Sequence, residues 1–168
     1  WAARNIGFLL QEIRLHGQNK ELVEEVVRLS RKFGIVTEYT AFLAGSGAPL
    51  PDELAFRKAK ERMQEANAQQ SGQWAVNQAY NDKSLQQRVV AGQQANTFVD
   101  QRGETRTADT VRQVGSRAFY QRDGRWVDAE EAGNRAVRKV KLFSTEYFDL
   151  VRQDEDFRRA QEIGERLN

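Results

Sequence analysis

Residues 19–43 read NKELVEEVVRLSRKFGIVTEYTAFL, and the fold prediction depends on the change of pattern inside this stretch. In residues 19–33 apolar side chains recur every three or four positions, with acidic residues in the first half and basic residues at the end. This arrangement is typical of an amphipathic helix that complements its own dipole. Gly34 is a natural stop for such a helix. Residues 35–43 then alternate β-branched or aromatic residues with others, which predicts a strand.

The residues before this stretch predict another helix. Apolar side chains in residues 1–16 have helical spacing, and the segment ends at Gly17. A single strand after two helices needs a partner strand, because buried backbone groups must be hydrogen-bonded. We therefore expect the sheet that receives residues 35–43 to lie in another part of the molecule.

The middle of the chain predicts a linker, two helices and a loop. Residues 44–51 contain both prolines and read as a flexible linker at the main internal boundary. Residues 52–96 predict two helices broken near residues 71–72, with a narrow buried face that needs another surface. Residues 97–110 are polar and aperiodic, which predicts a loop. The expected apolar anchors of the two helices are Leu54, Met63, Trp74, Val76, Tyr80, Leu85 and Val89.

Residues 111–168 predict a small β module with short helices. Apolar residues alternate in residues 111–127 around the dipeptide Asp123-Gly124, which is typical of tight hairpin turns. Residues 135–143 alternate again and predict a third strand.

Two short helices are predicted after these strands. Ser144 can cap a helix that runs through Val151, and residues 154–164 predict a last helix. The predicted fold class is therefore α+β and mainly helical, with two N-terminal helices plus a strand, a helical middle and a C-terminal three-stranded module.

The composition favours a largely helical protein with much exposed surface over a dense enzyme core. The 168 residues are 39% hydrophobic and 30% charged, and no stretch approaches the roughly 20 apolar residues of a membrane span. The 26 basic and 24 acidic residues are interleaved, which argues against nucleic-acid binding. The absence of cysteine excludes disulfides, thiolate zinc sites and cysteine nucleophiles. Because the chain opens at Trp1 without a leader, we expect a fragment of a longer polypeptide.

His16 is the only histidine, so paired-histidine metal sites are excluded and a Ser-His-Asp arrangement would depend on this residue. A favourable interaction with the dipole of the helix that ends there explains its position. No nucleophile motif accompanies it. We therefore predict no catalytic residue, no cofactor-binding residue and no metal ligand in this segment.

Acidic runs occur at residues 24–25, 130–131 and 154–156, in polar surroundings that would not raise a pKa for acid–base catalysis. Solvated faces are the expected explanation. Residues 45–47 (Gly-Ser-Gly) lack the Gly-Lys-Ser/Thr of a phosphate loop and precede prolines, so they are predicted to be part of the linker.

Two groups of side chains are candidates for binding a partner. Aromatic residues dominate interface hot spots, although a core position is the alternative for most of them. A basic group could meet an acidic protein or an anionic lipid, and the alternative is the charged outer face of an edge strand. The candidates are Trp74, Tyr80, Phe119, Tyr120, Trp126, Arg135, Arg138, Lys139 and Lys141.

Residues 1–43 resemble the segment after the von Willebrand A domain in bacterial proteins that also carry a vault-protein/inter-alpha-trypsin (VIT) domain, relatives of the inter-alpha-trypsin inhibitor heavy chains. The resemblance rests on the opening WA and on LSRKFGIVTEYTAFL at residues 29–43; the commoner family form has Pro where Glu38 stands. Residues 111–151, with VGSRAFYQRDGRWVDA and KVKLFSTEYFDLV, are similar to the C-terminal module of bacterial members. Residues 52–96 match no motif.

The resemblance implies a strand that joins a β-rich domain formed with the VIT region, and a location in the periplasm or at the cell surface. The family's adhesion site is an Asp-x-Ser-x-Ser motif that binds a divalent cation. The motif is absent from these 168 residues. We therefore expect no cofactor in this segment and, in a longer protein, a divalent cation bound upstream of it.

Two functions follow as hypotheses. The first is a non-catalytic protein–protein interaction or adhesion segment of a VIT/von Willebrand A-type protein. The second is a processed accessory or structural subunit of a larger cell-envelope or membrane-associated complex, held by residues 52–96 and the aromatic residues near the hairpin. Both predict protein partners and no nucleic acid. The single histidine argues against a third possibility, a hydrolase that uses His16.

Overall fold

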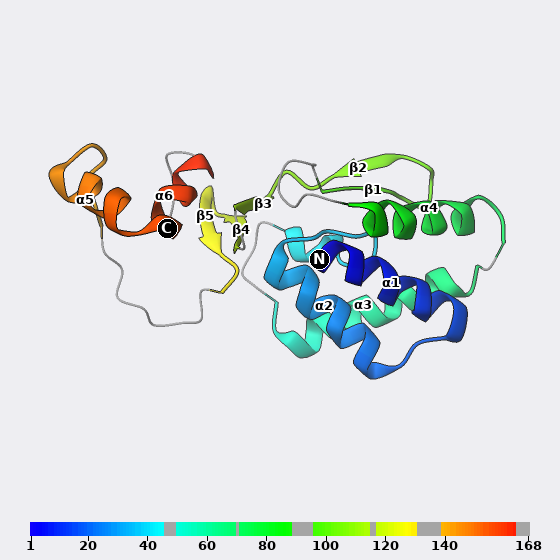
Figure 1. Cartoon of the computed structure of the whole chain (residues 1–168). Helices are drawn as coiled ribbons and strands as arrows, with labels where there is room; N and C mark the ends of the chain where they lie inside the picture. The colour runs from blue at the N-terminus through cyan, green and yellow to red at the C-terminus, as the bar shows by residue number, and fades with distance from the viewer. Residues whose placement is uncertain (46–49, 70, 89–95, 115–116, 131–138, 164–168) are drawn as a thin grey trace.

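The computed structural model describes residues 1–45, 50–69, 71–88, 96–114, 117–130 and 139–163. Their fold is α+β and mainly helical, as the sequence predicted, and it contains two small antiparallel sheets. Figure 1 shows the four long helices grouped together, with the β3–β5 sheet between them and the C-terminal helices. The helices are α1 (Ala2–His16), α2 (Lys20–Phe33), α3 (Asp52–Asn67), α4 (Gln73–Gln87), α5 (Thr145–Gln153) and α6 (Glu155–Ala160), with 3-10 turns at Ala41–Ala44 and Gln161–Ile163.

The first two helices form as predicted. The Asn19 side chain caps α2 by accepting a hydrogen bond from the Leu22 N–H at 2.8 Å, and Gly34 ends α2 in the left-handed conformation at φ 60°. Apolar faces of both helices meet in one core, in which Ile6, Ile13 and Leu29 are almost completely buried. The core also receives the small residues of α3, whose buried positions are mostly alanine.

The predicted strand at residues 35–43 is wrong. The segment is irregular through Thr40 and becomes a 3-10 turn at Ala41–Ala44, and every residue from Gly34 to Thr40 is buried. Its backbone groups bind side chains and local backbone groups instead of a neighbouring strand. Asn96 donates to the Gly34 carbonyl at 2.8 Å and accepts from the Val36 N–H at 3.2 Å. No distant sheet is needed to receive this segment, because side-chain amides and hydroxyls can replace a ladder.

Helix α4 forms where predicted but buries a polar face. Asn77, Gln78, Asn81 and Asp82 are buried, whereas the expected anchors Val76 and Tyr80 are exposed. The inward amides bind backbone: Gln78 donates to the Ala66 carbonyl at 3.2 Å. The expected anchor Val89 lies outside the described residues.

The predicted loop at residues 97–110 is also wrong, because it contains the antiparallel strands β1 (Thr97–Val99) and β2 (Thr105–Thr107). The Asp100 carboxylate organises the turn between them by accepting from the Arg102 and Glu104 N–H groups, both at 2.9 Å. Asn81 binds the outer edge of β1, donating to the Val99 carbonyl and accepting from the Val99 N–H, both at 2.9 Å. Strands this short carry no periodic signal, and their stability comes from these side chains.

Asn81→Ala is expected to lower the free energy of unfolding by about 2 kcal/mol, because it leaves the Val99 N–H and carbonyl without partners. Urea denaturation measures the loss, and hydrogen exchange should show faster exchange of the Val99 amide. Ser84→Ala, at an exposed position of the same helix, is the control and should change stability by less than about 0.5 kcal/mol. Equal effects of the two substitutions would contradict the role given to Asn81.

The predicted hairpin is confirmed. Strands β3 (Val111–Val114), β4 (Arg117–Arg122) and β5 (Arg125–Asp128) form one antiparallel sheet, and Asp123 and Gly124 turn it with φ of 48° and 76°. The third strand predicted at residues 135–143 is wrong for residues 139–143, which do not form a strand. Residues 131–138 lie outside the described residues. β3 supplies the third strand instead.

The sheet joins the helices at Gly34, whose neighbours include Val111 and Ala118. Its other face packs against the Gln161–Ile163 turn, where Phe119, Trp126, Ala160 and Ile163 form a separate cluster.

The two helices predicted after the sheet are confirmed, but they end at other residues. The Ser144 side chain caps α5 by accepting from the Tyr147 N–H at 3.2 Å, and Asp154 caps α6 in the same way. The expected final helix over residues 154–164 is shorter, ending at Ala160 and continuing as a 3-10 turn to Ile163.

Candidate functional site

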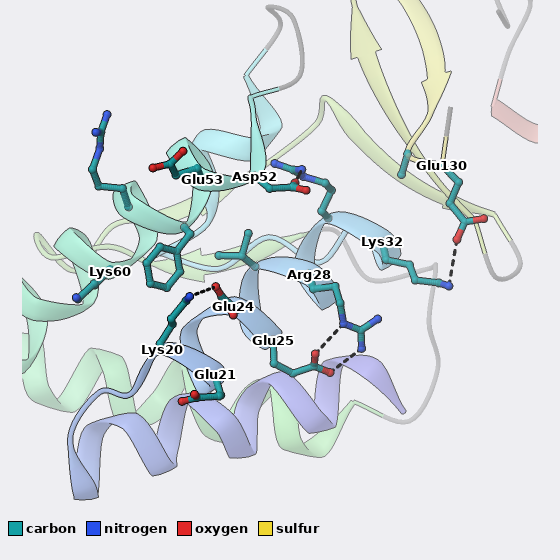
Figure 2. A pocket seen from close by; sticks show the side chains of 15 residues that line it. Lys20, Glu21, Glu24, Glu25, Arg28, Lys32, Asp52, Glu53, Lys60 and Glu130 are labelled. Atoms are coloured by element: carbon teal, nitrogen blue, oxygen red, sulfur yellow. Dashed lines mark hydrogen bonds and ion pairs between the residues drawn. The ribbon is translucent and has the colours of Figure 1, made fainter. Parts of the chain in front are cut away.

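A groove of about 1170 Å³ lies between α2 and α3 (Figure 2). Val27 and Phe56 supply its apolar lining, and six basic and six acidic side chains line the rest. Most charges are matched across or along it: Lys20 with Glu24 at 3.6 Å, and Lys32 with Glu130 at 3.1 Å. A groove with balanced charge has no preference for an anion or a cation.

Catalytic chemistry has no support in this groove. Two hydrogen bonds of 2.7 Å from Arg28 lower the pKa of Glu25, so this carboxyl is poorly suited to donate a proton. Arg31 makes an ion pair with Asp52 and so ties α2 to the start of α3. Ion pairs within α2 and between elements are sufficient to explain most of these charges, and the acidic residues 24–25 belong to the polar face that the sequence predicted.

A second cavity, of about 650 Å³, lies between the C-terminal half of α3, the start of α4 and the β1–β2 hairpin. Trp74 and Phe98 contribute aromatic surface, and the buried segment around Glu38 forms its base. Arg106 is held by Asp100 at 2.7 Å. The two Glu38 carboxyl oxygens are completely enclosed, so this carboxyl is part of the interior and not of the open space.

The interior beside this cavity holds an unusual buried carboxyl. Neither oxygen of Glu38 has a hydrogen-bond partner of good geometry among the described residues. Burial raises the pKa of Glu38 to about 8; Asn81 and Tyr39 lie close enough to lower it in part, and the charge of Asp82 raises it further. Burial likewise raises the pKa of Tyr39 well above its usual range.

Asp82 is the second buried acid of this cluster. Arg14 of α1 contacts it at 3.1 Å. Burial raises the pKa of Asp82 to about 6, and Arg14 only partly offsets that effect. The cluster therefore contains two buried carboxyls and one nearby arginine, which makes it sensitive to pH.

An exposed aromatic surface surrounds the start of α5. Leu142, Phe143 and Phe148 are 41%, 75% and 46% exposed, and we call these three residues the α5 surface. Tyr147 lies between the two phenylalanines, with ring centroids 5.8 Å from Phe143 and 5.3 Å from Phe148. None of the residues of α5 is buried, although the helix is amphipathic. Its apolar side contacts α6 through Tyr147 and Phe157, whose ring centroids are 6.0 Å apart, and it joins none of the buried clusters of the described residues.

Phe143 also has an unusual backbone. Its φ is 62°, in the left-handed region that a bulky side chain rarely adopts. Such a conformation costs on the order of 1 kcal/mol or more and is found most often at binding or switch sites. This backbone conformation places the Phe143 ring in solvent, immediately before the Ser144 cap.

The predicted partner-binding residues fall into two groups in the structure, one buried and one at least partly exposed. Tyr120 and Trp126 are buried, as is Phe119. The Tyr120 hydroxyl donates to the Arg31 carbonyl at 2.9 Å, and burial raises the Tyr120 pKa to about 12. The structure therefore places these three aromatic side chains in the interior, the core position that the sequence analysis gave as the alternative.

The remaining candidates lie elsewhere. Trp74 is half-buried against the main core, and Tyr80 is 64% exposed on α4. Lys139 and Lys141 are exposed just before the α5 surface. Arg135 and Arg138 lie outside the described residues.

The α5 surface was missed from sequence, although a signal existed. Phe143, Tyr147 and Phe148 lie within the six residues 143–148, shortly after Lys141. A short helix capped at Ser144 can bury so many aromatic side chains only against another surface. Their exposure could be found only from the position of α5 at the end of the molecule (Figure 1).

His16 is exposed at the end of α1, where its Nδ1 lies 3.0 Å from the Glu12 carboxylate. This partner and the helix end explain it without catalysis. Within the described ranges, no three or more His, Cys, Asp or Glu side chains gather in a way that could hold a metal ion. None of the described helices is both long enough and apolar enough to cross a membrane.

Comparison with known proteins gives no relative: no protein-family model, no curated protein and no solved structure matches this chain. Its possible function has to be argued from its own residues.

Proposed function

We propose that this chain is a non-catalytic protein-interaction segment and that the α5 surface is its principal contact with a protein partner. The observation that carries the proposal is an amphipathic helix without a single buried residue, preceded by a strained, 75% exposed phenylalanine. Exposed aromatic side chains are the usual centres of binding energy in protein interfaces.

The charges beside this surface define the partner further. Lys139 and Lys141 are exposed next to Leu142 and Phe143. A protein with an apolar pocket and acidic residues at its rim would fit, because charge pairs at a rim steer association while the buried aromatic group supplies affinity. The resemblance to the segment after a von Willebrand A domain agrees with an adhesion role at the cell surface or in the periplasm, and we include that location in the proposal.

Site-specific photo-crosslinking in the producing cells tests the proposal. A photoreactive phenylalanine analogue at Phe148 is expected to give one reproducible cross-linked partner, identified by mass spectrometry. The matched control is the same analogue at Glu61, an exposed position of α3. The double variant Phe143→Ser/Phe148→Ser should weaken binding of the identified partner about 30-fold or more, as expected for loss of a hot spot. Cross-linking that is equal at both positions, or absent from Phe148, would refute the proposal.

A second candidate function is an accessory subunit of a larger envelope or membrane-associated complex. The exposed Val76 and Tyr80 on α4 favour it, because this helix presents apolar side chains outward while it buries amides. The intact mass of the native protein distinguishes the two functions. A mature product near 19.3 kDa with a stable partner supports the subunit, and a much longer chain supports the interaction segment.

A further inference from the structure

The outer side of α1 carries a line of large apolar residues. Trp1, Phe8 and Leu15 are 76%, 56% and 60% exposed. They recur every seven residues, and a helix turns back to within about 20° of its starting direction over that interval. Phe8 and Leu15 therefore point in about the same direction, away from the buried Ile6 and Ile13. Trp1, the residue before α1, extends this line, and its ring also lies edge-on to Phe33 of α2 with centroids 6.2 Å apart.

Helix α4 lies beside α1 and runs antiparallel to it. Early residues of α1 meet late residues of α4, since Arg4 Nε donates to the Gln86 carbonyl at 3.0 Å, whereas Arg14 lies against Asp82. The helices approach closely at Gly7, where an added Cβ would stand 2.8 Å from the Asp82 carbonyl oxygen.

The outward residues of α4 face the same way as the line on α1. The axes of α1 and α4 are antiparallel, and the buried residues of both helices face the same core. Helical periodicity therefore places the exposed residues of both helices on the side opposite that core. Val76 and Tyr80, 61% and 64% exposed, therefore lie on the same side as the apolar line of α1 and add to its apolar surface. We call Trp1, Phe8, Leu15, Val76 and Tyr80 the α1/α4 face.

The α1/α4 face is large for a surface left in water. A large side chain buries on the order of 150–250 Å² when covered, and each of these five is more than half exposed, so together they leave several hundred Å² of apolar surface open. This is about the largest apolar patch of a typical monomer and a substantial part of the roughly 800 Å² that each partner contributes to a stable interface.

The order of residues along the outer side of α1 indicates what covers this face. Reading along the helix it presents Trp1, Arg4, Phe8, Glu12 and Leu15, and Arg4 and Glu12 are exposed like the apolar residues. The series is symmetric about Phe8 in position, with an apolar residue at each end, and antisymmetric in charge. A two-fold axis through Phe8 would set each residue opposite its complement on an identical helix.

We propose that a second copy of this chain covers the α1/α4 face, with the two α1 helices antiparallel about a two-fold axis at Phe8. Trp1 then lies against Leu15 of the partner subunit, and Arg4 lies against Glu12 of the partner subunit. Each pair occurs twice. Val76 and Tyr80 lengthen the contact at the Leu15 end.

Both charged groups are available for this pairing. Arg4 uses Nε for the Gln86 carbonyl, so its terminal amino groups remain to donate across the axis. Glu12 is 56% exposed at its side chain and contacts only His16 within its own helix in the described residues, which leaves acceptor capacity for a partner's guanidinium.

Sedimentation velocity of the chain over 1–100 µM tests the proposal. We expect a concentration-dependent monomer–dimer equilibrium, and Phe8→Glu, which would place two like charges on the axis, should abolish the dimer. Circular dichroism checks that the variant remains folded. A monomer at every concentration would overturn the proposal, as would a dimer unaffected by Phe8→Glu.

A charge exchange tests the antiparallel arrangement itself. Arg4→Glu alone and Glu12→Arg alone each bring like charges together twice and should weaken the dimer roughly tenfold. The double variant Arg4→Glu/Glu12→Arg restores opposite pairs and should restore the dimer. Failure of the double variant to recover, with both singles weakened, would overturn the two-fold arrangement.

A cysteine at the axis gives a geometric check, because the natural chain has no cysteine. Mild oxidation should link Phe8→Cys into a covalent dimer, whereas Leu15→Cys should not link, since it faces Trp1 of the partner subunit. Preferential linking of Leu15→Cys would contradict the axis.

The dimer does not depend on the α5 surface. Phe148→Glu should leave the sedimentation behaviour unchanged while it weakens binding of the partner identified at α5, so the two proposals can fail separately. If the chain is monomeric and the α1/α4 face is protected from hydrogen exchange only in a longer natural polypeptide, another domain is the occupant and the second copy is rejected.

Discussion

Gly34→Ala is expected to lower the free energy of unfolding by about 3 kcal/mol, one of the two largest effects predicted for this chain. Gly34 ends α2 at φ 60°, where a Cβ costs roughly 1 kcal/mol or more. An added Cβ would also stand 2.8 Å from the Ala118 Cβ and 2.9 Å from Val111 Cγ1. Forcing a methyl group into a packed site costs about 1–3 kcal/mol in addition.

Gly124→Ala is the control for this substitution. Gly124, in the β4–β5 turn, also has a positive φ, 76°, but an added Cβ would meet nothing within 4 Å. It should therefore show the conformational cost alone, about 1 kcal/mol. Urea denaturation of both variants measures the difference. If Gly124→Ala costs as much as Gly34→Ala, close packing of the sheet against the end of α2 is not what makes Gly34 necessary.

Glu38→Gln is expected to change the pH dependence of stability by about 2 kcal/mol between pH 4.5 and pH 8. The pKa of Glu38 is near 4.5 in the unfolded chain and about 8 in the folded protein, because the carboxyl is buried. At about 1.4 kcal/mol per pH unit the whole interval would give more than this, and relaxation with water entry reduces it.

The sign follows from proton binding. Between pH 4.5 and pH 8 the folded chain keeps a proton on Glu38 that the unfolded chain has lost. Stability from this group is therefore complete below pH 4.5, falls as pH rises, and is lost above about pH 8. Asp82, whose folded pKa is about 6, acts with the same sign at lower pH. Glutamine stays neutral, so the variant loses the part of this slope that Glu38 causes.

Thermal unfolding at pH 4.5, 6 and 8 measures this effect. Relative to the natural chain, Glu38→Gln should gain about 4–8 °C in Tm between pH 4.5 and pH 8, given about 2–4 °C per kcal/mol for a chain of this size. Glu61→Gln, on the exposed face of α3, is the control and should shift Tm equally at every pH. Parallel pH profiles for the natural chain and Glu38→Gln would contradict a protonated buried Glu38.

The sequence alone determined the elements whose signals are local. Regular apolar spacing, the order of the charges and Gly34 were enough for α2, and Asp123-Gly124 was enough for the β4–β5 turn. Ser144 marked the start of α5 for the same reason. Caps, turns and periodicity act over a few residues, so they can be read without knowing what lies nearby in space.

Only the tertiary structure decided three features of this protein. They are the conformation of residues 35–43, the face of α4 that is buried, and which aromatic side chains are buried or exposed. The strand-like pattern of residues 35–43 was overridden because Asn96, about 60 residues away, binds their backbone. Asn81 stabilises β1 in the same way, through hydrogen bonds to the backbone of Val99. The buried amides of α4 face inward because they bind backbone groups of this kind. Exposure of Phe8 and Phe143 likewise depends on which surfaces remain uncovered. Long-range partners decide each of these features, and no local pattern records them, because an amide can satisfy a backbone group at any separation along the chain.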